Sequence, residues 1–558
     1  MSAAASEAQG PAGPGRARRG GGPPNPVWLR EMRQFSRLTR TPFLLMTLTV
    51  LLALLLCAIG GIASMTASPA SIGAGLHHTF FSIAFFVVTL AGPALAANGI
   101  ASEREGRTWE ALLLTGLAPG VIARGKFLAA YTHVALYVVM LAPVGALPFL
   151  FGGVTAVEVV LAFVWLFLFA LLAVAFGLAV SSKMDSLRVA LLVTLLCAFL
   201  LSPTAYGIGT ALSHAAHLAW PAVPDALPVW LPTAYERAPF SLAYLGALVA
   251  LPLGAVALPS WFLYEVTVAN LTSVTDDRST GVRRWFFVTS AALTATGLAL
   301  VAQADDASDA AMLAMGALLG YFFYLVFCAF VFAGEPIGPS RRVVRGWERA
   351  RAGALQRFLG PGVVRASVSL LFAGLGGLSA LTAAGFALSY ARPASPLATP
   401  PHDAGAVLIF GAYALGFSLF AIGFGAWVRA RAGSPAVARV LLLVALLVVT
   451  AGPWLGAAIA GVLSRDLEAG ALLFAAPSPS YAFVAADQVR SGSARAGSAV
   501  AAAGSCAAIW AVLGLTLLAR AGGRCRAIIA AHDEALARGD ALLADEDARA
   551  ARAARAGG

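Results

Sequence analysis

The sequence predicts an all-α membrane protein that crosses the bilayer about twelve times. Hydrophobic residues make up 59% of the 558 positions, and charged residues only 12%, about half of the roughly 25% in a soluble globular chain. The mean hydropathy is +0.81. The hydrophobic residues gather in runs of about 20, the length of helix that crosses the hydrocarbon core. These features exclude a soluble enzyme and a large extramembrane domain.

Short polar or charged segments separate the apolar runs, so each run is interpreted as one membrane helix. The expected helices lie at residues 43–63, 80–100, 127–148, 158–180, 189–212, 240–264, 285–303, 311–333, 366–390, 405–428, 440–463 and 498–519.

The distribution of positive charge predicts the orientation of these helices. One set of alternate loops and tails carries 33 of the 38 lysines and arginines, and the other set carries 5. Because cytoplasmic loops are enriched in positive charge, both termini are predicted to be cytoplasmic. Nearly all of that charge is arginine, a composition typical of GC-rich coding, which favours a bacterial inner (plasma) membrane.

Two similar segments indicate an internal repeat. RVALLVTLLCAFLLSP begins at Arg188 and RVLLLVALLVVTAGP begins at Arg439, each after a short basic turn. The order of long and short loops also agrees between the halves. The sequence therefore predicts two six-helix repeats of the same orientation, related by an axis along the membrane normal. Their expected bounds are 43–265 and, for a diverged second unit, 285–519, with a cytoplasmic linker at 266–284.

The segments outside the spans are predicted to be cytoplasmic. Residues 1–26 are rich in Ala, Gly, Pro and Arg and predict a disordered tail, and residues 520–558 form an Ala/Arg-rich tail that favours a solvated helix. Residues 27–42 predict an interfacial amphipathic helix, which either lies on an anionic membrane surface or serves only as a topology anchor. Its characteristic residues are Trp28, Arg30, Glu31, Arg33 and Arg37.

A charged segment between Ser102 and Lys126 follows the second apolar run. Ser102 and Glu105 have the spacing of a capping box, and acidic residues favour the first turn of a helix. The pattern predicts a short, rigid helix over residues 102–117 at the cytoplasmic surface. Such a helix can transmit force from a soluble partner to the neighbouring spans. The alternative is a capped surface helix that only links two spans.

This segment resembles the first cytoplasmic loop of type-2 ABC exporter permeases. The matching residues are Glu103, Arg104, Glu105, Thr108, Glu110, Leu112, Leu113, Thr115, Gly125 and Lys126. Residues 25–31 with Arg37 also resemble the interfacial entry helix of such permeases, and the resemblance covers about residues 25–265. Two positions depart from the family pattern. Gly116 stands where proline is usual, and Gly106-Arg107 precedes Thr108 where Gly-Thr is commoner.

The resemblance implies a fused tandem of permease units whose loop docks on a cytoplasmic ABC ATPase. The implied coupling residues are Ser102, Glu103, Arg104, Glu105, Thr108, Glu110, Gly125 and Lys126. The sequence has no G-x-x-x-x-G-K-[ST] phosphate loop, so we expect ATP on a separate subunit and no cofactor in this chain. We expect membrane lipid as a partner. Whether a further permease copy is also a partner stays open.

The corresponding segment of the second half, residues 335–365, contains seven arginines interleaved with Trp347, Leu355 and Phe358. Two interpretations stay open. The segment is a degenerate coupling helix, or it is a basic amphipathic helix bound to acidic lipid head groups.

Other site classes have little support. The sequence shows no catalytic triad, paired carboxylates or metal motif, so we expect a transport subunit with no catalytic residues and no metal. Its positive charge lies between apolar runs, so we expect no nucleic acid partner. His133 is the main ionisable residue inside a predicted span, and a hydrogen bond to neighbouring backbone is its simpler interpretation. Two rival functions remain: a secondary transporter with two six-helix halves, and a non-transport membrane scaffold or a membrane enzyme acting on lipid. The sequence predicts neither the transported substrate nor the direction of transport.

Overall fold

The computed structural model is helical, with no strand in the parts of the chain it describes, which are residues 24–35, 40–65, 68–219, 245–393, 402–464 and 471–556. Ten of the helices described are long and apolar enough to cross a membrane. A pair bent by 44° makes an eleventh if it counts as one span. These helices confirm the prediction of a multi-pass, all-helical membrane protein. The predicted tail residues 1–23 and Arg37 lie outside the described residues.

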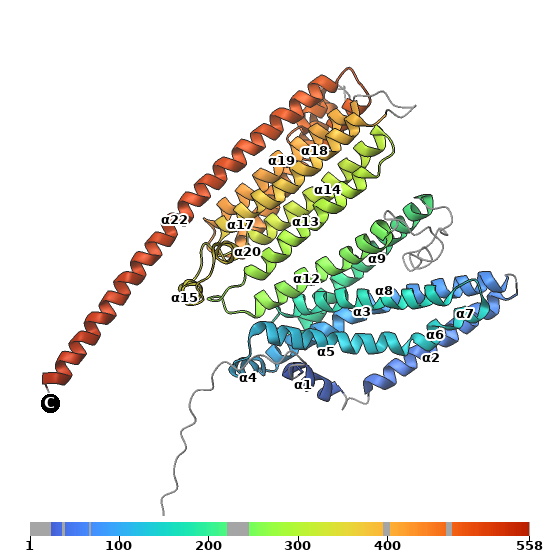
Figure 1. The fold of residues 1–558 in the computed structure, drawn as a ribbon, viewed down its shortest axis with the longest axis horizontal. Coiled ribbons are helices and arrows are strands. Elements are labelled where there is room, and N and C mark those ends of the chain that lie inside the picture. Colours follow the sequence, from blue (N-terminus) through green and yellow to red (C-terminus); the bar gives the residue numbers. More distant parts are fainter. Residues whose placement is uncertain are drawn as a thin grey trace, which may run out of the picture. The chain divides into compact units, whose positions relative to one another are not determined.

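The chain divides into two compact units (Figure 1). Unit 1 comprises residues 1–211 and 226–232, and unit 2 comprises residues 212–225 and 233–558. The helices that begin in unit 1 are α1 (Pro26–Phe35), α2 (Arg40–Ala63), α3 (Pro69–Glu105), α4 (Trp109–Leu114), α5 (Pro119–Met140), α6 (Ala142–Gly145), α7 (Leu147–Phe151), α8 (Ala156–Ser181) and α9 (Leu187–Ala219).

The longest helix of unit 1, α3, packs along α8 and α5. Its core side chains include Phe80, Phe81 and Ile100, all with 0% exposure. At Gly177 of α8 the two helices approach so closely that a side chain would collide with the Pro93 carbonyl of α3. This contact explains a glycine in the middle of an otherwise aliphatic run, because small residues allow membrane helices to approach closely.

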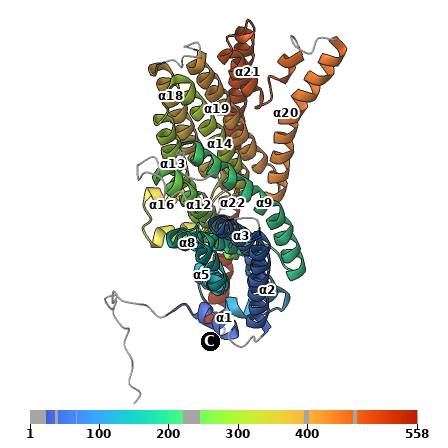
Figure 2. The ribbon, with the colours of Figure 1, turned by 90° about the vertical axis from the view of Figure 1, so that its right-hand side faces the viewer.

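Unit 2 contains the remaining helices, several of which stand side by side in Figure 2. They are η2 (Gly246–Ala250), α12 (Leu251–Leu271), α13 (Thr280–Ala302), α14 (Ala307–Phe332), α15 (Arg341–Arg349), α16 (Ala354–Leu359), α17 (Val363–Ser369), η3 (Leu370–Leu375), α18 (Gly376–Ala391), α19 (His402–Arg429), α20 (Pro435–Ser464), η4 (Ala471–Ala475), α21 (Tyr481–Arg490) and α22 (Ala496–Ala556).

The packing order in unit 2 follows that in unit 1. Here α14 packs against α18 and α19, as α3 packs against α5 and α8. α19 also packs along α22, where Gly423 and Gly514 bring the two backbones together. α12 packs against α13 in unit 2, although the sequence repeat would count it as the sixth helix of the first half. The six-helix repeat stays a prediction.

Two predicted helix boundaries differ from the structure by more than ten residues. The second helix begins at Pro69 and not near residue 80. Its first turns contain His77 and His78, which lower the local hydropathy without opposing a helix, and Pro69 suits a first helical position. The last predicted helix does not end near residue 519, because α22 continues without a break to Ala556, so the solvated helix predicted for residues 520–558 is continuous with the last span. Figure 1 shows this helix extending well beyond the end of α19 in the same unit.

Candidate functional site

The predicted coupling segment is the end of α3, a tight turn and the short helix α4. α3 continues through Glu105, and the Ser102 hydroxyl donates to the Asn98 carbonyl one turn earlier. The capping box predicted at Ser102 and Glu105 is therefore wrong, and so is a single helix over 102–117. The spacing fits a helix start, but the apolar run before it already forms a helix that continues into these residues.

A Schellman motif ends α3. The Thr108 amide donates to the Glu103 carbonyl at 2.9 Å, and the Arg107 amide donates to the Arg104 carbonyl at 3.1 Å. Arg107 has a φ of 55°, the left-handed conformation for which glycine is usual at this position. Arg107, which separates Gly106 from Thr108 and departs from the permease pattern, is thus accommodated in a left-handed conformation.

The second departure from the family pattern also has a conformational consequence. Gly116 follows α4 with a φ of 70°. Proline is restricted to a φ near −65°, so it could not occupy this position in the observed backbone. The chain between α4 and α5 therefore follows a path that depends on glycine.

Glu105 and Arg104 connect the turn to the start of α9. The Leu187 amide, at the first residue of α9, donates to Glu105 Oε2 at 2.8 Å. A carboxylate is favourable there because unpaired amides and the helix dipole make a helix N-terminus positive. Arg104 lies 3.3 Å from Asp185 and 5.7 Å from the centre of the Trp109 ring. The end of α3, α4 and α9 are thereby held together.

Four charged residues form a compact cluster, called the charge cluster below: Arg30 and Glu31 of α1, Glu103 of α3 and Lys126 of α5. The ammonium nitrogen of Lys126 lies 2.7 Å from Glu31 Oε1 and 2.8 Å from Glu103 Oε1. Arg30 pairs with the same two carboxylates. The Lys126 side chain is 3% exposed, so its charge depends on these partners.

The charge cluster balances two cations against two carboxylates. Burial alone would raise the pKa of Glu31, but Lys126 and Arg30 outweigh it and lower the pKa below the ordinary 4.5. The sequence singles out all four residues, yet it places Arg30 and Glu31 in an interfacial helix and the other two in a separate loop. Their assembly is a feature of the fold that the sequence analysis missed.

Gly125 explains how α1 reaches this position. A Cβ atom there would lie 2.6 Å from both Asn25 Oδ1 and Val27 Cβ, so only glycine permits the approach of α1 to α5. The Asn25 side chain accepts a hydrogen bond from the Val27 amide at 2.9 Å and donates one to the Val121 carbonyl at 2.9 Å. The Gly125-Lys126 pair thus has two roles: the glycine admits α1, and the lysine binds it.

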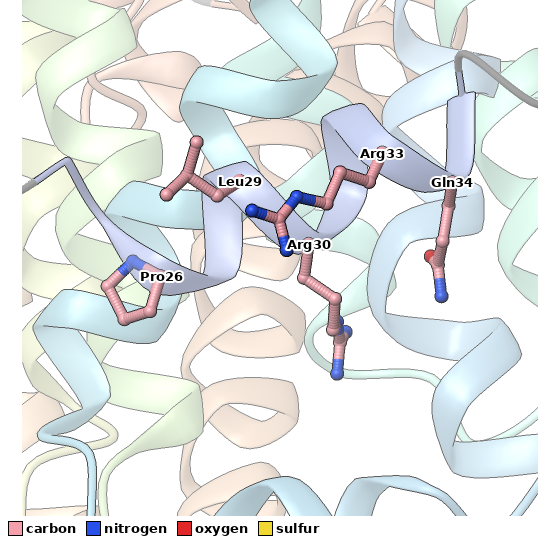
Figure 3. Close-up of a pocket in the computed structure, with 5 residues that line it drawn as sticks. All are labelled: Pro26, Leu29, Arg30, Arg33 and Gln34. Atoms are coloured by element: carbon pink, nitrogen blue, oxygen red, sulfur yellow. The ribbon is translucent and has the colours of Figure 1, made fainter.

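The outer face of α1 is polar. Arg33 and Gln34 are exposed, and Figure 3 shows them with Pro26, Leu29 and Arg30 around a surface pocket of about 340 Å³. On the other side of α1, Phe35 stacks on His133 of α5 with ring centres 4.0 Å apart. Contacts of α1 with α5 therefore extend over the whole helix.

The outer face of α4 is the most exposed part of the predicted coupling segment. Leu114 is 87% exposed, whereas Leu112 is buried. Arg107, Thr108 and Glu110 are also exposed. A single exposed leucine is ordinary on a protein surface, but it leaves this face of α4 accessible to another molecule. Glu103 contributes to the charge cluster instead of this surface.

Unit 2 has a buried ionic cluster around Glu335, just after α14. The Arg283 guanidinium of α13 is 0% exposed and lies 3.4 Å from Glu335 Oε2. It also donates to the main-chain carbonyls of Phe358 at 2.9 Å and Gly362 at 2.7 Å. Sequence reasoning missed this cluster. The available signal was an acidic residue near the end of a long helix in each half: Glu103 lies in the last turn of α3, and Glu335 shortly follows α14.

The residues described contain no group of three His, Cys, Asp or Glu side chains able to hold a metal ion. No protein-family model matches the chain, and a comparison with curated proteins finds no relative. The resemblance of the α3–α5 segment to permease loops therefore rests on the residues themselves.

Proposed function

We propose that this chain is the permease subunit of an ABC exporter in a bacterial inner membrane, and that α4 docks on a separate cytoplasmic ATPase. The charge cluster carries this proposal. Any displacement of the turn between α3 and α4 acts on α1 and α5 through Lys126, and on α9 through Glu105. A surface that projects a leucine and is tied to four helices suits the transfer of force from a soluble motor.

The same proposal includes twelve spans in two parallel six-helix halves with both termini in the cytoplasm. It is supported by the ten or eleven candidate spans together with α2, and by the 33 to 5 division of positive charge. The matching packing of α3 and α14, and the acidic residue near the end of each, Glu103 and Glu335, support two similar halves.

The experiment is affinity purification of the tagged chain from its native membranes. We expect an ATPase with a phosphate loop to co-purify. Combining Leu114→Ala with Glu110→Arg should reduce its recovery at least about tenfold, because contact residues at the centre of an interface contribute most of the affinity. The matched control is Leu542→Ala with Glu546→Arg, the same two changes at exposed positions of α22, which should leave recovery unchanged.

Two outcomes would contradict the proposal. If no ATPase co-purifies with the unaltered chain, the proposed ATPase partner is refuted. If both double variants recover the ATPase equally, α4 is not the docking surface. Substrate movement by the purified chain alone, driven by an ion gradient, would favour the secondary-transporter alternative.

A further inference from the structure

An arginine-rich surface covers α15 in unit 2. Four arginines line a depression of about 380 Å³ on this helix: Arg341, Arg342, Arg345 and Arg349. All four are exposed. Guanidinium groups bind phosphate through two parallel hydrogen bonds, and they are less strongly hydrated than ammonium groups. A cluster of four is therefore suited to an anion that carries phosphate.

The orientation of α15 is determined by its apolar side. Val343 and Trp347 are buried within unit 2, and the Arg365 guanidinium stacks over the Trp347 ring at 5.2 Å. The Ser340 hydroxyl caps the helix by accepting the Val343 amide at 3.2 Å. Because its apolar side already packs on the protein, α15 cannot insert that side among acyl chains, as an interfacial amphipathic helix does. It presents its arginines instead.

The place of α15 in the chain indicates which phosphate it meets. It lies between α14 and α17, and each of these belongs to a helical segment apolar enough to cross a membrane. A segment between two such helices lies where they leave the hydrocarbon, at the level of the lipid head groups. Basic residues at that level attract anionic lipids.

A carboxylate already contacts part of this surface. Asp540 of α22 pairs with Arg341, with one contact of 3.1 Å between Nη1 and Oδ1. This hydrogen-bonded pair raises the pKa of Arg341 above its ordinary value. Arg342 lies 3.0 Å from Asp276. Two of the four arginines are therefore already paired with carboxylates of the same chain.

We propose that the arginine surface of α15 binds the phosphate head groups of anionic phospholipids, and that Asp540 of α22 competes with the head group for Arg341. The inference is independent of the proposed transport function, because lipid binding requires neither an ATPase nor a cargo. The C-terminal helix would then reduce lipid binding while it is docked on α15.

The test uses the full chain in a neutral detergent, titrated with phosphatidylglycerol or phosphatidylcholine of the same acyl composition, with bound lipid counted by native mass spectrometry. We expect retention of phosphatidylglycerol over phosphatidylcholine. Combining Arg345→Ala with Arg349→Ala should weaken phosphatidylglycerol binding about 25-fold, because each arginine near an anionic surface contributes about fivefold. Asp540→Asn should strengthen binding severalfold.

Matched controls separate this site from general charge attraction. Arg526→Ala with Arg538→Ala removes two exposed arginines elsewhere on α22 and should leave binding unchanged. Asp545→Asn, whose carboxylate pairs with Arg549, should not strengthen it. Equal loss in both double arginine variants, or no preference for phosphatidylglycerol, would overturn the proposal. So would equal competition by soluble glycerol phosphate or by polyglutamate, which would indicate a free anion or an acidic protein.

Discussion

Replacement of Lys126 by methionine is the most direct test of the charge cluster. The substitution keeps most of the side-chain volume but removes a charge that is 3% exposed and lies within 2.8 Å of two carboxylates. Glu103 and Glu31 would then share Arg30 as their remaining cation. Since their side chains are 14% and 19% exposed, water compensates for only a small part of the loss.

The magnitude follows from this geometry. Removal of one partner from a buried ion pair costs about 3–5 kcal/mol. We expect about 3 kcal/mol for Lys126→Met, the lower end of that range, because Arg30 still pairs with both carboxylates and is itself 41% exposed. Adding Glu31→Gln restores the charge balance. The double variant should therefore cost less than the sum of the single variants by about 1–3 kcal/mol.

The assay is equilibrium unfolding of the purified protein in mixed detergent micelles, followed by far-UV circular dichroism. Lys183→Met is the matched control, because Lys183 is the only other lysine and is exposed; its cost should stay within about 0.5 kcal/mol. The reasoning would be refuted if both lysine variants cost the same, or if the Lys126 and Glu31 costs simply added.

Three further predictions concern the same region. Arg107→Gly should stabilise the chain by about 1 kcal/mol, because glycine adopts the left-handed conformation without the steric cost; an unchanged or lower unfolding free energy would contradict the Schellman turn. Gly125→Ala should displace α1 and cost about 1–3 kcal/mol, whereas Gly120→Ala, with nothing within 4 Å of the added carbon, should be tolerated; equal costs would exclude the close approach. The lowered pKa of Glu31 stabilises the fold above its unfolded value near 4.5, and this contribution is lost as the pH falls through the folded pKa. The unfolding free energy should therefore fall less on acidification in Glu31→Gln than in the unaltered chain, and identical pH profiles would show that the carboxylate is not paired.

The sequence predicts the membrane class and the helical runs because hydropathy and length are local properties. It places the start of α3 too late because His77 and His78 lower the local average, although a helix tolerates them in its first turns. It misidentifies Ser102 and Glu105 for a related reason: the capping pattern tests only spacing, and a helix that continues from upstream satisfies the same spacing.

The candidate site shows a different limit. The residues of the charge cluster are all recognisable from the motif, but Glu31 and Lys126 are separated by 95 positions, and no local pattern pairs them. Arg283 and Glu335 are separated by 52 positions and belong to no motif. Periodicity determines which face of a helix is apolar. Which charges meet is determined by the packing of α1 on α5 and of α13 near the end of α14.

The two ionic clusters differ in a way that bears on the proposed coupling. In unit 1 the cluster joins side chains to side chains, and Arg30, Glu31 and Glu103 keep some contact with water. In unit 2 the Arg283 guanidinium has no exposure and donates to two main-chain carbonyls as well as to Glu335. Separating the first cluster leaves Lys126, which is 3% exposed, without its partners, and separating the second leaves a buried cation and two buried carbonyls unpaired, which costs more. Because both separations are costly, force transmitted as proposed should move the end of α3 together with α1 and α5, and should move the junction of α13, α14 and α17 as one body.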